Sequence, residues 1–250
     1  MQGSSSRIGF ITGAAGSIGR ATVRTLSSRG LAIATADQRR LPRSEAGLVA
    51  SELAVDLRDE AAIGNAVFKL RSLGRLEHVV AIAGGGDREE LAQSDPVTED
   101  LQIFSRVVTN NLLIAFSTIR HVVPLLREGN GNRSITLVGS INAFGGYGAP
   151  GYSAAKSGLI GLTNALATPL GADGIRINCL ALGTVDTENL RELAAARGAS
   201  PDLSAIAAKA PLGRVLTPGE VGRALAAIAL DMTGLTGATI VLDNGQTRIR

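Results

Sequence analysis

Short runs of apolar residues alternate along this chain with longer segments in which apolar positions recur at helical spacing. The short runs predict strands, and the longer amphipathic segments predict helices between them. This alternation is typical of a parallel sheet that is covered by helices on both faces. We expect strands at residues 7–12, 31–36, 52–56, 77–83, 133–139, 175–181 and 238–242. We expect helices at residues 17–29, 59–73, 99–128, 152–171, 188–197, 202–209 and 218–230.

The expected fold class is α/β, with a doubly wound, Rossmann-type parallel sheet. Crossovers in such a sheet are right-handed, and ligands bind at the carboxyl ends of the strands. The composition shows no linker, low-complexity segment or repeat, so we expect residues 1–250 to form one domain. Residues 1–6 are expected to be disordered, and residues 187–211 are expected to form a lid over the substrate.

Charge and hydropathy argue against two classes of partner. Lys and Arg total 25 against 22 Asp and Glu, and the net charge of +3 comes from scattered arginines. Arg39, Arg40 and Arg43 cluster without interleaved aromatic residues, so we expect no nucleic-acid binding. The apolar stretch 112–126 is interrupted by Arg120, so no run is long enough to span a bilayer and we expect no membrane partner.

The single cysteine, Cys179, lies in an apolar run and cannot form an internal disulfide. It is expected to be a small buried residue, and no signal peptide precedes the first predicted strand. These features predict a cytoplasmic protein. His78 and His121 lie in no matching motif, so we expect structural roles for both and no metal site.

The first turn from strand to helix is rich in glycine. The chain runs from Ile8 to Thr12 and then into the helix through Gly13, Gly16 and Gly19. Glycines at these places permit a tight turn, close approach of the backbone to a pyrophosphate, and packing of the helix on the strand. The free amide groups at the start of the helix then face the phosphate charge.

The second predicted strand leads to an acid, Asp37, which lies 18 residues after Gly19. A carboxylate at this place accepts hydrogen bonds from an adenosine ribose and repels a 2′-phosphate. NAD is therefore the expected coenzyme. NADP stays open as the alternative, because Arg39 or Arg40 can pair with a phosphate.

Tyr152 and Lys156 lie four residues apart in a predicted helix, so their side chains share one face. A free phenol has a pKa of about 10 and is a poor proton acceptor at neutral pH. A lysine charge about 4 Å away is worth up to about 4 kcal/mol, or roughly three pKa units. We therefore expect Lys156 to lower the pKa of Tyr152 and the pair to transfer protons. An exposed lysine beside a packed tyrosine is the alternative.

The same segment is close to the nucleophile elbow of a serine hydrolase. The run Gly151-Tyr-Ser153-Ala-Ala155 lacks the final glycine of that motif. The hydrolase fold also needs its histidine after the serine, and no histidine follows His121. The order of residues along the chain therefore excludes a serine hydrolase.

Taken together, these residues resemble the short-chain dehydrogenase/reductase family, in its short single-domain branch, from Thr12 to Gly245. In that resemblance the glycine turn is the coenzyme loop, Asp56 and Leu57 contact adenine, and Gly183–Thr187 contacts the nicotinamide carboxamide. The expected coenzyme contacts are Gly13, Gly16, Ser17, Ile18, Gly19, Asp37, Asp56, Leu57, Ala83, Gly84, Tyr152, Lys156, Gly183, Val185 and Thr187.

The resemblance also implies the active site. Asn111 matches the asparagine that positions a water, and Ser140 matches the serine that holds the reacting oxygen. Tyr152 is then the proton-transferring group, and Lys156 lowers its pKa and binds the nicotinamide ribose. The reaction implied is hydride transfer between NAD and a secondary alcohol or its ketone.

The sequence departs from the family pattern at several places. Ser17 stands where this branch usually has glycine, and we expect the loop to persist with the Ser17 hydroxyl on a phosphate. The usual asparagine after the fourth strand is Ile82, and the usual proline before the carboxamide loop is Leu182. The position of Gly16 is also similar to the epimerase-type branch, which usually carries a larger C-terminal domain.

Three alternatives remain: an NADP-dependent carbonyl or 3-oxoacyl reductase, an epimerase-type enzyme, and a non-catalytic NAD-binding sensor. A mainly apolar substrate pocket is expected at Ser140, Phe144, Tyr147, Tyr152 and Leu190. The resemblance implies a homotetramer formed by the helices near 99–128 and 152–171 and by the last strand.

Overall fold

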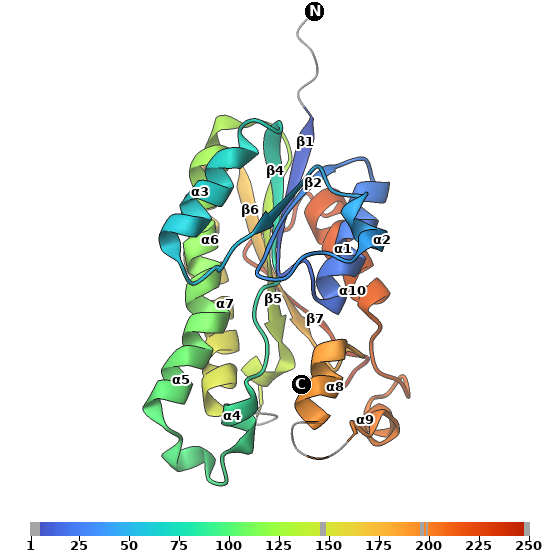
Figure 1. Ribbon diagram of the computed structural model, residues 1–250. Coiled ribbons are helices and arrows are strands. Elements are labelled where there is room, and N and C mark those ends of the chain that lie inside the picture. The colour runs from blue at the N-terminus through green and yellow to red at the C-terminus, as the bar shows by residue number, and fades with distance from the viewer. Residues whose placement is uncertain (1–5, 146–148, 196–197, 199, 248–250) are drawn as a thin grey trace, which may run out of the picture.

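The structure is a computed structural model that describes residues 6–145, 149–195, 198 and 200–247 (Figure 1). At its centre lies one parallel sheet of seven strands in the order β3-β2-β1-β4-β5-β6-β7. The doubly wound α/β class is confirmed, and each predicted strand boundary lies within two residues of the observed one. The strands are β1 (Arg7–Thr12), β2 (Ala32–Asp37), β3 (Ser51–Ala54), β4 (Arg75–Ala81), β5 (Arg133–Ser140), β6 (Ile175–Leu182) and β7 (Thr239–Leu242).

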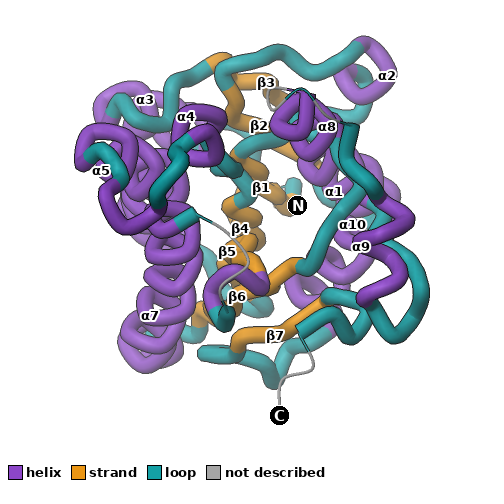
Figure 2. Tube along the Cα trace, turned by 90° about the horizontal axis from the view of Figure 1, so that it is seen from below, coloured by secondary structure: helices purple, strands orange, loops and turns teal. Residues whose placement is uncertain are grey.

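Helices cover both faces of the sheet (Figures 1 and 2). One layer contains α3 (Glu60–Leu70), α6 (Ile114–Glu128) and α7 (Pro150–Ala172). The opposite layer contains α1 (Ser17–Ser28) and α10 (Pro218–Ala226), which pack against each other. This two-sided cover explains why β5 and β6 are buried at every position.

Side chains in the central strands alternate between two hydrophobic cores. In β5, Ile135 and Leu137 join the core under α6 and α7, whereas Val138 joins the core under α1 and α10. Residues two apart in a strand point to the same face, so the apolar runs of the sequence supply both cores at once. The cores fix the ends of the strands, where the polar residues of the site lie.

All strands run toward the same end of the molecule, which carries α8 (Glu188–Ala195) and α9 (Leu203–Lys209) (Figure 1). Figure 2 looks onto that end, and α4 (Arg88–Ala92) also lies there. Helices α8 and α9 match the predicted ones to within two residues at each end, and their role as a lid stays a prediction. Strand order reverses between β1 and β4, and such a switch point leaves a crevice where coenzymes bind.

The predicted helix 99–128 is wrong as one continuous helix. The structure has α5 (Leu101–Val108), a π-helical turn at Thr109–Leu113, and then α6. A π turn carries one extra residue and is common at functional sites. Asn111 lies in this turn, so the irregularity falls on an expected active-site residue.

Other differences concern short or terminal segments. The short helices α2 (Arg43–Ala46) and α4 were not predicted, and α3 ends three residues before the predicted boundary. Disorder was expected through residue 6, but the Ser6 carbonyl accepts a hydrogen bond from the Arg75 amide at 2.8 Å. Residues 1–5 lie outside the described part of the chain. Among the described residues, no helix has the length and apolar character to cross a membrane.

Candidate active site

The glycine turn joins β1 to α1 and contacts the end of β4. Gly13 has a φ of 69°, and a Cβ built there would lie 2.6 Å from the Ala83 nitrogen. A Cβ on Gly19 would lie 2.2 Å from the Gly13 carbonyl oxygen. Gly16 differs, because its nearest neighbour would be that same oxygen at 3.6 Å. Packing within the protein therefore demands glycine at 13 and 19, and leaves free space beside 16.

The start of α1 fits a negatively charged group. Gly16 precedes the helix and supplies no side-chain cap, and the first turn contains no acidic residue. Uncapped amide groups at a helix N-terminus attract anions such as a pyrophosphate. Ile18 lies in this first turn with its side chain packed against the core under α1 and α10. The turn can therefore hold the phosphates of a dinucleotide.

Asp37 lies at the end of β2 and faces the same turn. Its carboxylate accepts hydrogen bonds from the Ala15 amide at 3.0 Å and from the Arg39 amide at 2.9 Å. These bonds fix the carboxylate beside the glycine turn, where a ribose with two free hydroxyls would fit. The Arg39 backbone is thereby fixed, while its side chain is exposed.

Asp56 and Leu57 follow β3. Asp56 forms a salt bridge with Arg58, and hydrogen bonds from Arg58 hold the pKa of Asp56 well below its usual range. Leu57 is buried in the core under α6 and α7. The expected adenine contact therefore falls on one ion-paired side chain and one packed side chain.

Asn111 connects the π turn to the loop after β4. Its side-chain oxygen accepts a hydrogen bond from the Gly85 amide at 2.8 Å, and its nitrogen donates to the Gly85 and Val107 carbonyls at 3.0 Å. Gly84 lies so close that a Cβ there would come within 2.6 Å of the Asn111 oxygen. The side chain of Asn111 therefore fixes the loop that borders the coenzyme crevice.

Ser140 is the last residue of β5 and is 8% exposed. Its hydroxyl donates a hydrogen bond to the Asn142 side-chain oxygen at 3.0 Å and accepts one from the Asn142 amide at 3.2 Å. Asn142 was not singled out in the sequence, because the turn that brings it back onto Ser140 has no sequence signature. These two bonds fix the position of the hydroxyl at the end of β5.

Tyr152 and Lys156 lie on the first two turns of α7, as expected. The Lys156 nitrogen is 5.5 Å from the centre of the Tyr152 ring and donates a hydrogen bond to the Val138 carbonyl at 3.0 Å. Lys156 is only 3% exposed. The lysine is therefore a buried cation above the tyrosine ring, and the alternative of an exposed lysine is wrong.

The expected lowering of the tyrosine pKa by Lys156 is wrong for the protein alone. Burial raises the pKa of Tyr152, and a hydrogen bond from Ser140 offsets part of that rise. Burial also lowers the pKa of Lys156 to about 8, which weakens its charge as an acid–base partner. The sequence could not show how much of each group the fold covers, so it predicted the wrong direction for the pKa shift of Tyr152.

The single cysteine lies beside this lysine. Cys179 is fully buried, as expected, and burial raises the pKa of its thiol to about 11. A Cβ on Gly139 would come within 2.7 Å of its sulfur. Cys179 therefore fills space between β5 and β6. His78 is likewise buried, with its ring bonded to Ser134 at 2.9 Å.

The loop after β6 leads into α8. A Cβ on Gly183 would lie 2.7 Å from the Asp243 Cα atom, so this glycine permits contact with the end of β7. Val185 is buried and pairs with Leu216. The Thr187 hydroxyl accepts a hydrogen bond from the Leu190 amide at 3.1 Å. Thr187 therefore supports the first turn of α8.

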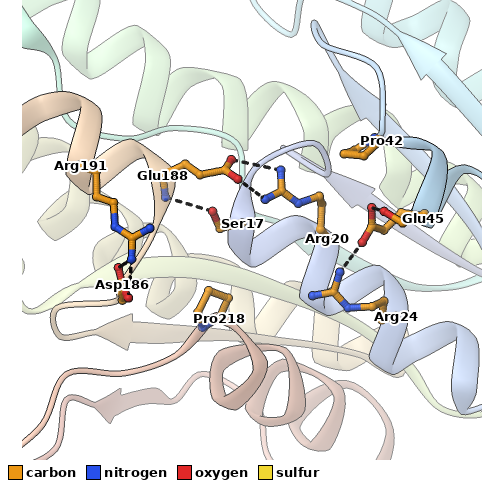
Figure 3. A pocket seen from close by; sticks show the side chains of 10 residues that line it. Ser17, Arg20, Arg24, Pro42, Glu45, Asp186, Glu188, Arg191 and Pro218 are labelled. Atoms are coloured by element: carbon orange, nitrogen blue, oxygen red, sulfur yellow. Dashed lines mark hydrogen bonds and ion pairs between the residues drawn. The ribbon is translucent and has the colours of Figure 1, made fainter.

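The first residue of α8, Glu188, is tied to the glycine turn (Figure 3). Arg20 donates two hydrogen bonds to its carboxylate, at 2.6 and 3.2 Å. The Ser17 hydroxyl accepts a hydrogen bond from the Glu188 amide at 3.2 Å. The hydroxyl of Ser17 thus contacts α8, and its expected contact with a phosphate stays a prediction. These residues line a pocket of 470 Å³ between α1, α2, α8 and α10.

The opposite end of α8 lies over the loop after β4. A Cβ on Gly86 would lie 2.9 Å from a Leu193 methyl group, and Arg88 forms a 3.5 Å ion pair with Glu192. Helix α8 therefore reaches from the glycine turn to the Gly84–Gly86 loop, across the coenzyme crevice. The sequence predicted the helix, but the ion pairs that place it join residues far apart in the chain.

The expected substrate residues lie near the mouth of this region. Phe144 follows a short turn after Ser140 and is 44% exposed, and Leu190 is half-buried in the first turn of α8. Tyr147 lies outside the described residues. An exposed aromatic ring four residues after Ser140 suits an apolar substrate.

Fold and site together define a dinucleotide-binding oxidoreductase with a tyrosine–lysine centre. Residues 13–247 match the family described as "Enoyl-(Acyl carrier protein) reductase". The chain belongs to the short-chain dehydrogenase/reductase family, as its motifs predicted. It is therefore an oxidoreductase of a family that binds NAD or NADP.

Several known proteins are similar over nearly the whole chain. It is 31% identical to the cis-4-hydroxycyclohexanecarboxylate dehydrogenase of Sinomonas cyclohexanicum, with 97% of each chain covered. It is 29% identical to the 3-oxoacyl-[acyl-carrier-protein] reductase FabG of Escherichia coli, with 96% of each covered. It is 34% identical to an uncharacterized dehydrogenase/reductase, y4vI, of Sinorhizobium fredii, but spans only 43% of that protein's length.

Solved structures share the fold. The structure described as "a putative short-chain dehydrogenase/reductase from Burkholderia xenovorans" superposes with a TM-score of 0.82 at 26% identity, covering 97% of this chain and 98% of that one. The protein ElxO with NADP bound superposes with a TM-score of 0.85 at 20% identity, covering 98% and 99%. The second likeness shows the fold alone.

Proposed function

We propose that this protein interconverts a secondary alcohol and its ketone, with NAD as the coenzyme. The observation that carries the proposal is the meeting of Ser140, Tyr152 and the buried Lys156 at the end of β5. The similar dehydrogenase from Sinomonas cyclohexanicum is named for a cyclic secondary alcohol, which supports this class of substrate.

The residues act on protons and on orientation. Ser140 holds the substrate oxygen, and its bonds to Asn142 fix the direction of its hydroxyl. Tyr152 takes the alcohol proton during oxidation and returns it during reduction. Lys156 presents its ammonium group to the ribose hydroxyls, and Asn111 holds the loop that borders the crevice. When bound, the nicotinamide supplies the hydride chemistry.

The raised pKa of Tyr152 bears on this role. Burial keeps the phenol protonated in the protein alone, so it is ready to donate a proton to a ketone. Oxidation of an alcohol needs the phenolate, and the rate of oxidation should therefore rise with pH. Reduction should be favoured at neutral pH, where the phenol carries its proton.

Asp37 supports NAD over NADP. Its carboxylate is fixed at the ribose end of the crevice by the Ala15 and Arg39 amides. Replacement by serine removes the negative charge, so Asp37→Ser should raise the ratio of kcat/KM for NADP to that for NAD at least tenfold. An unchanged ratio would contradict the assignment. The control is Asp59→Ser, since Asp59 only caps α3.

A second candidate is an NADP-dependent 3-oxoacyl reductase. Similarity to FabG supports it, and the exposed side chains of Arg39 and Arg40 lie next to Asp37 in the chain. We favour the first candidate because the Asp37 carboxylate is held toward the glycine turn. Rates with each coenzyme on a 3-oxoacyl thioester and on cyclic ketones would separate the two.

The test of the main proposal uses Tyr152→Phe. The variant should lose at least 100-fold in kcat with a panel of secondary alcohols, because the proton acceptor is gone. NAD should bind with unchanged affinity in titration calorimetry. Retained turnover would overturn the assignment, and absent turnover in the wild-type protein with every alcohol and ketone would favour a sensor.

We also propose that the chain assembles as a homotetramer. Leu113 and Phe116 are 52% and 47% exposed around the start of α6, a position where the family resemblance places an interface. Apolar side chains of this size favour contact with a second copy. Light scattering should give four times the mass of the chain, and a monomer would contradict the proposal.

A further inference from the structure

A carboxylate from a distant helix binds the backbone at the start of α7. The Glu90 side-chain oxygen accepts a hydrogen bond from the Tyr152 amide at 2.9 Å. The Gly151 amide bonds the same side chain, and a Cβ on Gly151 would lie 2.9 Å from this oxygen. Glu90 belongs to α4, 62 residues before the tyrosine, and is only 3% exposed.

This contact replaces the usual N-terminal cap of the helix. The residue before α7, Ala149, has no side chain that can cap it, and Pro150 has no amide hydrogen. The next two amides, at Gly151 and Tyr152, would lack partners without Glu90. A negative charge at a helix N-terminus also interacts favourably with the helix dipole. Glu90 therefore fixes the turn of backbone that carries the tyrosine.

The surroundings of Glu90 are unusual for a purely structural cap. Its second oxygen is buried and, among the described residues, has no hydrogen-bond partner. Both oxygens of Glu99, in the segment before α5, are likewise buried and have no partner in the described part of the chain. Burial raises the pKa of Glu90, and the charges of Glu99 and Asp87 add to that rise. A cap alone needs only one oxygen and gains nothing from a second acid nearby.

Two cations near Glu90, Arg106 and Lys156, already have hydrogen-bond partners. Arg106 of α5 bonds Asp87 and Glu89, so its guanidinium is engaged at the edge of the cluster. Lys156 lies over the Tyr152 ring and donates a hydrogen bond to the Val138 carbonyl. The negative charge of Glu90 therefore acts on the phenol, and it raises the pKa of Tyr152.

We infer that Glu90 is a positioning residue for Tyr152, which holds the first turn of α7 and places a negative charge at the backbone of the tyrosine. The inference rests on the proposed role of Tyr152 in proton transfer. Glu90 does not touch the substrate. Its effect reaches the reaction through the backbone of the tyrosine and through the electrostatic field at the phenol.

Two substitutions separate the backbone effect from the charge effect. Glu90→Gln keeps an acceptor for the amides and removes the charge, and its amide nitrogen can donate to the unpartnered oxygens of Glu99. Glu90→Ala removes both. The matched control is Glu89→Gln, the same change on the adjacent residue of α4, which is exposed and bonds only Arg106 and its own helix.

The charge effect is measured without turnover. Ultraviolet absorbance of tyrosinate follows the phenol directly, and Tyr152→Phe identifies its signal against that of Tyr147. In Glu90→Gln the titration of Tyr152 should move at least 0.5 pH units lower than in the wild-type protein, within the range where circular dichroism stays native. Coincident curves would overturn the electrostatic part of the inference, even if the proposed reaction were wrong.

The positioning effect is measured by kinetics. Glu90→Ala should lose at least tenfold in kcat with little change in KM for NAD, because the tyrosine moves and the coenzyme turn does not. Glu90→Gln should recover most of kcat at its own optimum, with the alkaline rise of oxidation shifted to lower pH. Glu89→Gln should match the wild type. Wild-type kcat in a folded Glu90→Ala would overturn the positioning role, and if that variant does not fold, the pH profile of Glu90→Gln decides.

Discussion

The Lys156 nitrogen lies above the ring of Tyr152, 5.5 Å from its centre, and Lys156 is buried while Tyr152 is partly buried. A cation over an aromatic face is attracted by the electrons of the ring. The arrangement places the charge beside the phenol and away from solvent. Burial has a cost for that charge, because it lowers the pKa of Lys156 to about 8.

This lowered pKa predicts the pH dependence of coenzyme capture. Above pH 8 the amine loses its proton and becomes a weaker donor to the ribose, so the affinity for NAD in titration calorimetry should fall as pH rises through about 8. Lys156→Arg keeps its charge at all accessible pH and should lack this fall. An identical inflection in both proteins would contradict the assignment.

The glycine turn gives a matched pair of substitutions. Gly13→Ala places a side chain at a positive φ and 2.6 Å from Ala83, so it should destabilise by about 2 kcal/mol or more and lower Tm by about 4 °C or more. Gly16→Ala meets nothing closer than 3.6 Å and should fold with unchanged Tm. It should still bind NAD at least tenfold more weakly in titration calorimetry, because its methyl occupies the free space at the turn. Wild-type affinity in Gly16→Ala would place the coenzyme elsewhere.

The ion pair between Arg20 and Glu188 should stabilise α8 without a large effect on the rest of the fold. Exposed pairs contribute only about 0.2–1 kcal/mol, so Arg20→Gln should barely change Tm. Loss of up to about 1 kcal/mol should speed amide hydrogen exchange in α8 by up to about fivefold. Arg71→Gln breaks a similar exposed pair with Glu128, far from α8, and should leave that exchange unchanged. Equal exchange rates of α8 in the two variants would show that the pair between Arg20 and Glu188 does not stabilise this helix.

His78 should make the fold sensitive to acid. Burial lowers its pKa from 6.5 to about 4, with the charge of Glu77 opposing the shift and those of Arg7 and Arg176 adding to it. The unfolded chain therefore binds a proton below pH 6.5 that the folded protein refuses, and stability from this group is lost as pH falls through 6.5 toward 4. The shift corresponds to about 3 kcal/mol.

His78→Gln lacks this titration, and urea unfolding at pH 7 and pH 4 measures the difference. The advantage of the wild-type protein over the variant should shrink by about 3 kcal/mol between the two values. The carboxylates of the chain titrate in both proteins, so their contribution cancels in the comparison. Parallel losses in the two proteins would show that His78 does not titrate as expected.

The strands were predictable because a parallel sheet covered on both faces demands continuous apolar runs. The glycine turn, Asp37, Ser140, Tyr152 and Lys156 were found because each follows a strand or has fixed spacing. The prediction of one continuous helix at residues 99–128 was wrong for a different reason. The π turn at Asn111 leaves the apolar periodicity of its helix nearly intact, so one continuous helix was expected.

Contacts between distant residues left no trace in the sequence. Arg20 and Glu90 act through the fold, on Glu188 and on the first turn of α7. The predicted direction of the Tyr152 pKa shift was wrong for the same reason. A spacing of four residues shows that two groups meet, but the cover that surrounds them comes from other helices.

The burial of Cys179 has a practical consequence for following the lid in solution. Its thiol is fully covered and its pKa is raised to about 11, so it should not react with maleimides at neutral pH. The chain has no other cysteine. A cysteine introduced on the exposed face of α8 would therefore carry a fluorescent label at one defined position, with the natural thiol left in place.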